Sequence, residues 1–137
     1  MDEKQKEIWN VVLTYTDLIM QGKIDEFLEH FHEDYSGWSN IEPIPADKES
    51  IISELHNRSS QKITVQYDLI PIKIKIHDNI AVVHYYLHER KKDKNEIKES
   101  QIKHYTDILI NINNRWFLLA DHFGVKIYKY FENSIEG

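Results

Sequence analysis

Hydrophobic residues in the first third of the chain recur at helical spacing. Residues 3–21 carry one apolar stripe, which consists of Ile8, Trp9, Val12, Leu13, Thr16, Ile19 and Met20. This spacing predicts an amphipathic helix, and Gly22 predicts where it ends. A second, short helix is expected over residues 23–31, and a third over residues 47–57 with Asp47 as its N-cap. Between them, residues 32–45 hold Gly37, two prolines and several polar residues, which predicts a loop.

The pattern changes from helical to alternating in the second half of the chain. Alternation is clearest from Ile72 to Ile76, where isoleucine and lysine take turns. It predicts strands over residues 63–77, 80–90, 98–113 and 115–123. Asp78-Asn79 and Asn113-Asn114 are the expected tight turns, and residues 91–96 are an expected charged hairpin loop. Helices followed by strands predict an α+β fold, with the helices packed on one face of an antiparallel sheet.

Composition narrows the class of protein. The chain has 137 residues, 41% of them hydrophobic, and no cysteine, so we expect one folded domain over residues 1–137 without disulfides. Residues 125–137 are expected to form a terminal extension. The formal net charge of -6 argues against a nucleic-acid partner. The N-terminal segment is polar, and no apolar run reaches the roughly 20 residues needed to cross a bilayer. We therefore expect a soluble cytoplasmic protein with no membrane partner.

A family resemblance follows from the order of these elements and a few motifs. A long amphipathic helix precedes a short helix ending in F-H-E-D-Y-S-G-W, then a third helix, then strands carrying D-N-I-A-V-V-H-Y-Y, H-Y-T-D-I-L-I and R-W-F-L-L-A-D-H-F-G. From Glu7 to Gly124 the chain resembles the NTF2-like superfamily, in its SnoaL-like and association-domain branch. Thr106, Trp116 and His122 carry the most specific part of the resemblance. The glycine often found before the tryptophan is absent, and Asn113-Asn114 takes its place.

The resemblance implies a fold and a range of functions. The fold is a cone, in which three N-terminal helices pack on a curved antiparallel sheet around a pocket, and dimers are common. Members include isomerases, cyclases and dehydratases, but also binding and assembly domains, so the fold does not determine the function. In association-domain relatives, pocket-lining residues occupy the positions of Leu87 and Asp107. Relatives with arginine there bind small anions, and this chain lacks that positive charge.

The strands offer two alternative faces to the pocket. One face collects Val83, Tyr85, Tyr105, Asp107, Leu109, Leu119 and Asp121, and the other collects Val82, His84, Tyr86, His104, Thr106, Ile108, Ile110 and His122. The sequence does not determine which face lines the cone, because a slip of one residue exchanges them. We favour the acidic face, with His122 as an added member if the strand end bends.

Two functional hypotheses follow for an acidic pocket. In the first, Asp107 or Asp121 is a general base of raised pKa, and a phenol of Tyr15, Tyr35 or Tyr85 donates to a developing oxyanion. This would be a cofactor-independent isomerase, cyclase or dehydratase. The alternative is that both aspartates are hydrogen-bonded or solvated residues at strand ends.

In the second hypothesis the protein binds a small apolar or aromatic ligand, or only oligomerises. Tyr35 and Trp38 are expected in a loop that rims the cone, with Leu87 and His122 among the ligand-binding residues. The alternative is that these aromatic rings plug the open end of the core. The expected partners are a small-molecule ligand and a second copy of the chain, in a homodimer formed through the sheet.

A metal site is a weaker candidate. The nearest cluster is His30-x-His32-x-Asp34, and no spacing matches a known metal signature. We expect His30 and His32 at the C-terminus of the second helix, where the dipole favours a protonated imidazole. The expectation is therefore no metal and no cofactor.

Overall fold

The predicted first helix is present and well capped. The structure, a computed structural model, describes residues 1–58, 64–93 and 96–125. Helix α1 (Glu3–Met20) begins at a capping box, in which the Asp2 carboxylate accepts from the Gln5 backbone N–H and the Gln5 side chain accepts from the Asp2 N–H. Its buried face differs from the expected stripe in two places, because Tyr15 is buried and Leu13 is exposed.

Two shorter helices follow, close to their predicted positions. Helix α2 (Ile24–Leu28) ends earlier than expected, and α3 (Lys48–Arg58) begins directly after a two-residue strand, β2 (Ala46–Asp47). The Asp47 carboxylate accepts from the Ser50 N–H at 2.8 Å, so the predicted N-cap is confirmed.

The predicted loop over residues 32–45 is wrong in its first half. Residues Phe31–Ser39 form strand β1, whose side chains alternate between buried and exposed from Tyr35 to Ser39. Gly37 and the exposed polar residues Glu33, Asp34 and Ser36 concealed this strand. His30 and His32 consequently do not lie on the last turn of a helix.

The remaining strands form a long meander. They are β3 (Thr64–His77), β4 (Ile80–Asp93), β5 (Glu96–Ile112) and β6 (Arg115–Val125). The predicted hairpin loop over residues 91–96 is wrong at both ends, because β4 runs to Asp93 and β5 starts at Glu96; residues 94–95 lie outside the described part. The expected terminal extension also lies outside it, except for Val125, which ends β6.

Both predicted tight turns are confirmed by their backbone. Asp78 has φ 52°, and Asn113 and Asn114 have φ 52° and 65°. Asparagine and aspartate tolerate this left-handed region better than other residues with a side chain. The asparagine pair therefore replaces glycine between β5 and β6, and the Asn111 side chain accepts from the Asn114 N–H at 3.1 Å.

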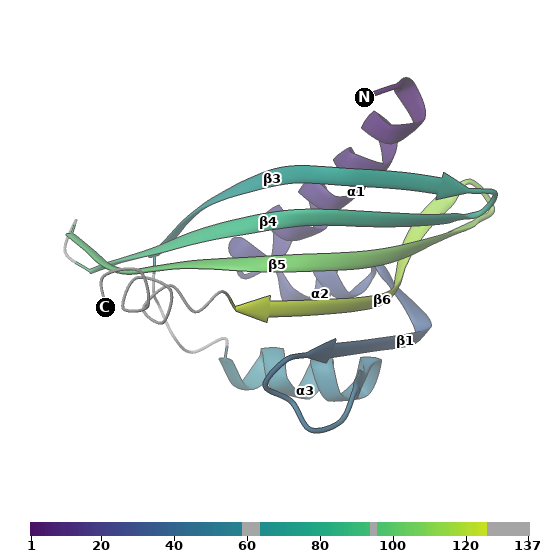
Figure 1. Cartoon of the computed structure of the whole chain (residues 1–137). Helices are drawn as coiled ribbons and strands as arrows, with labels where there is room; N and C mark the ends of the chain where they lie inside the picture. The colour runs from purple at the N-terminus through teal and green to yellow at the C-terminus, as the bar shows by residue number, and fades with distance from the viewer. Residues whose placement is uncertain (59–63, 94–95, 126–137) are drawn as a thin grey trace.

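The strands form one six-stranded sheet in the order β2-β1-β6-β5-β4-β3. All neighbours are antiparallel except β1 and β6, which run parallel, so the expected antiparallel sheet is in fact mixed. Figure 1 shows the sheet curving, with α1 and α2 behind one face and α3 beside β1. The predicted α+β architecture of helices on a curved sheet is confirmed.

The core lies between α1 and the face of the sheet turned toward the helices, which we call the inner face. Its buried apolar side chains include Ile8 and Val12 from α1 and Ala81, Val83, Leu109 and Leu118 from the strands. Within the described residues, no helix is both long enough and apolar enough to span a membrane.

Candidate functional site

The inner face carries a short row of acidic residues across its middle. Asp107 on β5 pairs with Val83 on β4 and with Asp121 on β6, and Asp121 pairs in turn with Gly37 on β1. Asp107 is 1% exposed, which places it among the most buried side chains of the described residues. The favoured acidic face is therefore the one turned toward the helices.

Two tyrosines converge on one oxygen of Asp107. The phenol of Tyr15, from α1, and that of Tyr85, from β4 at 2.8 Å, both donate to Oδ2. The other oxygen, Oδ1, is buried and has no hydrogen-bond partner. Burying an ionised carboxylate with one oxygen that accepts no hydrogen bond costs much free energy. Protonation of Oδ1 removes the charge and lowers that cost.

Burial and a neighbouring charge change the acidity of Asp107. Desolvation first, and then the negative charge of Asp121, raise the pKa of Asp107 to about 7, against the opposing effect of the two phenol donors. The pKa values of Tyr15 and Tyr85 are raised as well, chiefly by burial and by Asp107. Both tyrosines are therefore neutral donors near neutral pH.

Asp121 is the more accessible member of the pair. Its residue is half-buried, and its Oδ1 accepts a hydrogen bond from the Tyr35 phenol at 2.7 Å. Burial raises the pKa of Asp121 to about 6, while the Tyr35 hydrogen bond and nearby His122 oppose that rise. Titratable neighbours whose pKa values are pushed upward in this way are typical of functional sites, although structural networks also produce them.

An aromatic row adjoins the acidic row. Tyr85, Tyr105 and Phe123 are paired across β4, β5 and β6, and their rings stack with centroid distances of 5.1 and 5.2 Å. Trp9 from α1 packs edge-on against Tyr85 at 5.7 Å. Polar groups that converge beside apolar rings match the composition of small-molecule sites.

One member of the predicted acidic face is misplaced. The pairing of β5 with β6 shifts between Ile108 and Leu109, so Leu109 lies opposite Leu118 and not Leu119. Leu118 is 2% exposed and belongs to the core, whereas Leu119 is only half-buried. A β-bulge of this kind exchanges faces along one strand, and strict alternation in the sequence cannot reveal it.

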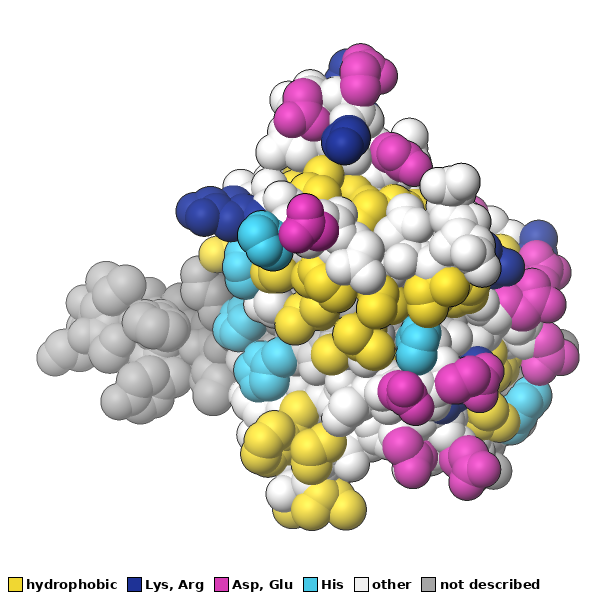
Figure 2. All heavy atoms as spheres, turned by 90° about the vertical axis from the view of Figure 1, so that its right-hand side faces the viewer, with side chains coloured by type: hydrophobic (Ala, Val, Ile, Leu, Met, Phe, Trp, Pro, Cys, Tyr) yellow, Lys and Arg dark blue, Asp and Glu magenta, His cyan; other side chains and the backbone are white. Residues whose placement is uncertain are grey.

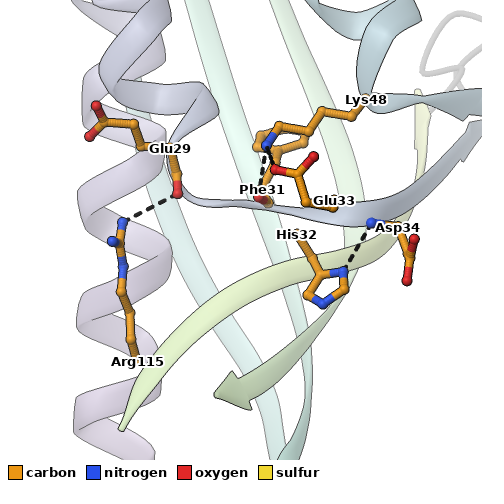
Figure 3. A network of polar contacts seen from close by, with 7 residues as sticks. All are labelled: Glu29, Phe31, His32, Glu33, Asp34, Lys48 and Arg115. Atoms are coloured by element: carbon orange, nitrogen blue, oxygen red, sulfur yellow. Dashed lines mark hydrogen bonds and ion pairs between the residues drawn. The ribbon is translucent and has the colours of Figure 1, made fainter. Parts of the chain in front are cut away.

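Contacts along β1 fix the strand that carries Tyr35. The Lys48 ammonium donates to the Phe31 carbonyl at 3.3 Å and pairs with Glu33 at 2.8 Å, and the His32 ring accepts from the Asp34 N–H at 2.9 Å (Figure 3). At the start of β6, Arg115 donates to the Glu29 carbonyl at 3.2 Å. Because β1 and β6 run parallel, all of these contacts hold the same end of the pair, the one at which both strands start.

Two predicted ligand-binding residues lie on the opposite, outer face. Trp38 and His122 are paired across β1 and β6, and both are exposed, Trp38 by 47%. The indole N–H of Trp38 donates to the Glu42 carbonyl at 2.7 Å. The expectation that His122 bends inward and that Trp38 rims the cone is wrong, because neither strand reverses its faces at that point.

The outer face also collects exposed apolar side chains and histidines. The apolar members are Trp38, Ile70, Tyr86 and Ile112. His84 and His122 flank Thr106 in one row across the strands, and the His84 ring bonds the Thr106 hydroxyl at 2.9 Å. Figure 2, which looks at the end of the molecule that carries the β3–β4 turn, shows hydrophobic side chains next to histidines on that surface.

The far end of the inner face is lined by Leu87 and an ion pair. Leu87, a predicted pocket residue, is 3% exposed and lies opposite Lys103. Lys103 pairs with Glu89 at 3.3 Å and lies over the Phe123 ring at 6.0 Å. The inner face therefore runs from an apolar floor through the acidic and aromatic rows to a charged end.

The histidine cluster considered for a metal does not assemble. Among the described residues, no group of three or more His, Asp, Glu or Cys side chains could hold a metal ion. Burial and nearby Arg115 lower the pKa of His30, so the protonated imidazole expected there is disfavoured.

Sequence reasoning missed two features of this site. It treated Gly37 only as a sign of a loop, and it placed Tyr105 on the acidic face without a role. The alternation of Tyr35, Gly37 and Ser39 at a period of two was the available signal for a strand. The hydrogen bonds of Tyr15 and Tyr35 had no local signal, because each joins residues that are far apart in the chain.

Comparisons with known proteins identify the fold. No protein-family model and no curated protein match the chain. Among solved structures, a candidate scytalone dehydratase from Novosphingobium aromaticivorans aligns with a TM-score of 0.76 at 14% identity, covering 90% of this chain and 85% of that one. A ketosteroid isomerase-like protein from Erwinia carotovora atroseptica aligns with a TM-score of 0.72 at 11% identity, covering 91% and 98%.

A third similar structure belongs to a multi-subunit enzyme. The β subunit of benzoate 1,2-dioxygenase from Burkholderia mallei aligns with a TM-score of 0.78 at 12% identity, covering 95% of this chain and 93% of that one. At such low identity the likeness establishes the fold alone. NTF2-like proteins recur among the similar structures, including one of unknown function from Pseudomonas putida. The chain therefore has the NTF2-like fold, as its sequence pattern predicted.

Proposed function

We propose that this protein binds a small apolar or aromatic molecule against the inner face of the sheet and catalyses cofactor-independent proton transfer on it. The observation that carries the proposal is the opposition of Asp107 and Asp121 on β5 and β6, with one oxygen of Asp107 unpartnered. The reaction class is isomerisation, cyclisation or dehydration next to a carbonyl. Similar folds in a candidate dehydratase and an isomerase-like protein agree with this class.

The two aspartates have different roles in this proposal. Asp121 is half-buried and has a lower pKa than Asp107. Its carboxylate is therefore the base that takes a proton from the carbon beside the carbonyl. Asp107 is protonated on Oδ1, which is buried in the free protein and which the substrate uncovers on binding in this proposal. From there it donates a hydrogen bond to the oxygen that becomes negative. The proton on Asp121 then returns to another carbon in an isomerisation, or to a departing hydroxyl in a dehydration.

The tyrosines support this division and are not themselves the acid. Tyr15 and Tyr85 both direct their protons to Oδ2 of Asp107, which leaves Oδ1 as the oxygen that carries the carboxyl proton. Tyr35 donates to Asp121 and keeps its carboxylate oriented. Pairs of carboxyl groups whose surroundings separate their pKa values are a recurrent device for acid and base chemistry.

A carbon-acid probe tests the proposal without knowledge of the substrate. Nitrobenzisoxazole loses one C–H proton to a base while its N–O bond breaks, and the product is a coloured cyanonitrophenolate. We expect turnover by the native chain and a loss of about 10²- to 10⁴-fold in Asp121→Asn. Asp34→Asn, the same change at an exposed site on β1, is the matched control. Equal rates in all three proteins would contradict the assignment of Asp121 as base.

Binding without catalysis is the second candidate function. The exposed apolar side chains of the outer face and the similarity to a dioxygenase β subunit favour a role in assembly. An unreactive isostere, nitrobenzotriazole, distinguishes the candidates by calorimetry. Binding of the isostere with no turnover of the probe supports a binding domain, and neither binding nor turnover supports an assembly domain.

Self-association belongs to the same proposal. We infer that a second copy covers the outer face, because Trp38, Ile70 and Tyr86 leave apolar surface exposed on it. A single domain over residues 1–137, the absence of a cofactor or metal, and a cytoplasmic location stay predictions from the sequence.

A further inference from the structure

Gly37 lies directly beside the proposed base. It is buried on β1 and pairs with Asp121 on the parallel strand β6. Gly22 is the described glycine with a positive φ, so the backbone of Gly37 is one that any residue adopts. The conformation of the strand therefore does not require glycine at this position, and another reason must be sought.

The space above Gly37 is filled by a hydrogen bond. A Cβ atom added to Gly37 would lie 1.8 Å from the Tyr35 Oη, 2.4 Å from the Asp121 Oδ1 and 2.6 Å from the Tyr35 Cζ. Oη and Oδ1 are the donor and the acceptor of the 2.7 Å bond between Tyr35 and Asp121. A single methyl group would thus collide with both ends of that bond.

Neither neighbour can move away without a cost in free energy. Tyr35 is 5% exposed, and its ring packs on Phe31 at 4.5 Å between centroids. Lys48, the first residue of α3, donates a hydrogen bond to the Phe31 carbonyl and so holds the start of β1 in place. On the other side, Asp121 is bounded by Asp107 on β5, so it cannot retreat without bringing two carboxyl groups closer.

We propose that Gly37 is a positioning residue of the acidic site: its missing side chain is the space in which the Tyr35 phenol meets the Asp121 carboxylate and sets the direction of that carboxylate. The geometric part of this inference stands on the contacts alone. Its consequence for the rate rests on the proposed function, in which Asp121 is the base.

Alanine at position 37 is expected to act through the broken hydrogen bond. The phenol of Tyr35 lowers the pKa of Asp121, so separating the two raises that pKa further. Crowding of Asp121 toward Asp107 acts in the same direction, because like charges at short distance disfavour ionisation. The base is then available only at higher pH.

The test compares two glycine-to-alanine changes within strands. Gly37→Ala is the test variant and Gly124→Ala the control. For Gly124, the three atoms nearest to an added Cβ all belong to the exposed ring of His104, with Nε2 at 2.8 Å, and that ring can rotate away. The readout is the titration midpoint of the Asp121 carboxyl carbon, followed by NMR in the full chain with isotope-labelled aspartate.

We expect the Asp121 midpoint to rise by about half a pH unit or more in Gly37→Ala and to stay unchanged in Gly124→Ala. The probe reaction with nitrobenzisoxazole should shift its acidic limb by the same amount. If the native chain does not turn over the probe, the titration still decides the role of Gly37, so the two proposals fail separately. An unchanged midpoint in a folded Gly37→Ala protein would overturn the inference.

A rescue variant covers the case in which Gly37→Ala does not fold. Tyr35→Leu together with Asp121→Ala removes all three atoms that the new methyl group would meet. If adding Gly37→Ala to this double variant leaves its folded NMR spectrum unchanged, the inference is supported. If the double variant folds and the triple variant does not, the collision lies elsewhere and the inference is wrong.

Discussion

Asp107 on β5 and Asp121 on β6 lie opposite each other, with both side chains on the inner face of the sheet. Antiparallel neighbours bring their side chains within about 4.5–5.5 Å at Cβ, and like charges so placed destabilise the pair. Burial adds to this repulsion, so the pKa of Asp107 rises to about 7 and that of Asp121 to about 6. The pair therefore holds one proton about midway between these two values, and several of the predictions below depend on that proton.

The stability of the protein should fall as pH rises through the acid pair. The folded-state pKa of Asp107 is about 7 and its ordinary value 3.8, so the folded protein binds more protons between these values. The contribution of Asp107 to stability is then greatest below the ordinary value and is lost as pH rises through the folded pKa, by on the order of 4 kcal/mol. Chemical denaturation at several pH values in this range measures how the free energy of unfolding changes with pH.

Asp107→Asn should flatten that dependence, because asparagine cannot ionise. Its stability relative to the native chain is expected to increase steadily with pH, whatever its value at low pH. Asp34→Asn serves as the control, since the same change at an exposed site should leave the pH dependence of stability unchanged. Parallel pH curves for Asp107→Asn and the native chain would show that Asp107 is ionised when buried.

Loss of a buried phenol should cost more than loss of an exposed one. Tyr15→Phe leaves Oδ2 of Asp107 with one donor in place of two, and we expect a loss of about 1–3 kcal/mol. Tyr67→Phe removes a comparable hydrogen bond, 2.8 Å to the exposed Asp17, and should cost less than about 1 kcal/mol. Urea unfolding of both variants tests this, and equal costs would mean that the Tyr15 phenol contributes no more than a surface contact.

The proposed reaction should have a bell-shaped pH profile. Asp121 must be ionised to act as base, so activity rises with pH through about 6. Asp107 must keep its proton, so activity falls again through about 7. Because the two groups interact, these values describe the pair as a whole. The profile of kcat/KM for nitrobenzisoxazole is the measurement.

Asp107→Asn separates the two limbs of that profile. The alkaline limb should disappear, because an asparagine amide does not lose a proton in this range, while the acidic limb should remain. An alkaline limb that persists in this variant would assign it to another group.

The β5–β6 turn should accept glycine and resist residues with a larger side chain. Asn114 has φ 65°, so Asn114→Gly is expected to keep or slightly raise stability. Asn114→Ala should lower it by about 1 kcal/mol, because alanine disfavours the left-handed region. Thermal denaturation compares the two, and a more stable alanine variant would mean that the turn relaxes to another type.

Self-association should depend on the outer face. The native chain is expected to scatter light as a dimer at micromolar concentration, and Tyr86→Lys should yield the monomer, because a charge is then buried at the contact. Lys4→Glu, on the N-terminal turn of α1, is a surface charge control. A native chain that is monomeric at that concentration would contradict the homodimer.

The sequence predicted which side of the sheet a residue faces where strand pairing is regular, and failed where the pairing shifts. Strict alternation along the strands puts Tyr85, Asp107 and Asp121 on one side, and the structure places all three on the inner face. Leu119 was assigned to that face by the same rule and does not belong there, because the bulge between Ile108 and Leu109 advances β6 by one residue. Trp38 and Tyr35 were expected together but lie three positions apart on one strand, and so face opposite ways.

The sequence by itself determined the three helices followed by four long strands, the Asp47 cap, the two tight turns, and the two sets of strand residues that could meet a ligand. These features depend on local spacing and on the backbone preferences of aspartate, asparagine and glycine. The tertiary structure alone decided which set faces the helices, which tyrosine bonds which aspartate, and why Gly37 has no side chain. Those outcomes depend on contacts such as that of Tyr15 with Asp107, which join residues 92 positions apart and leave no local pattern in the chain.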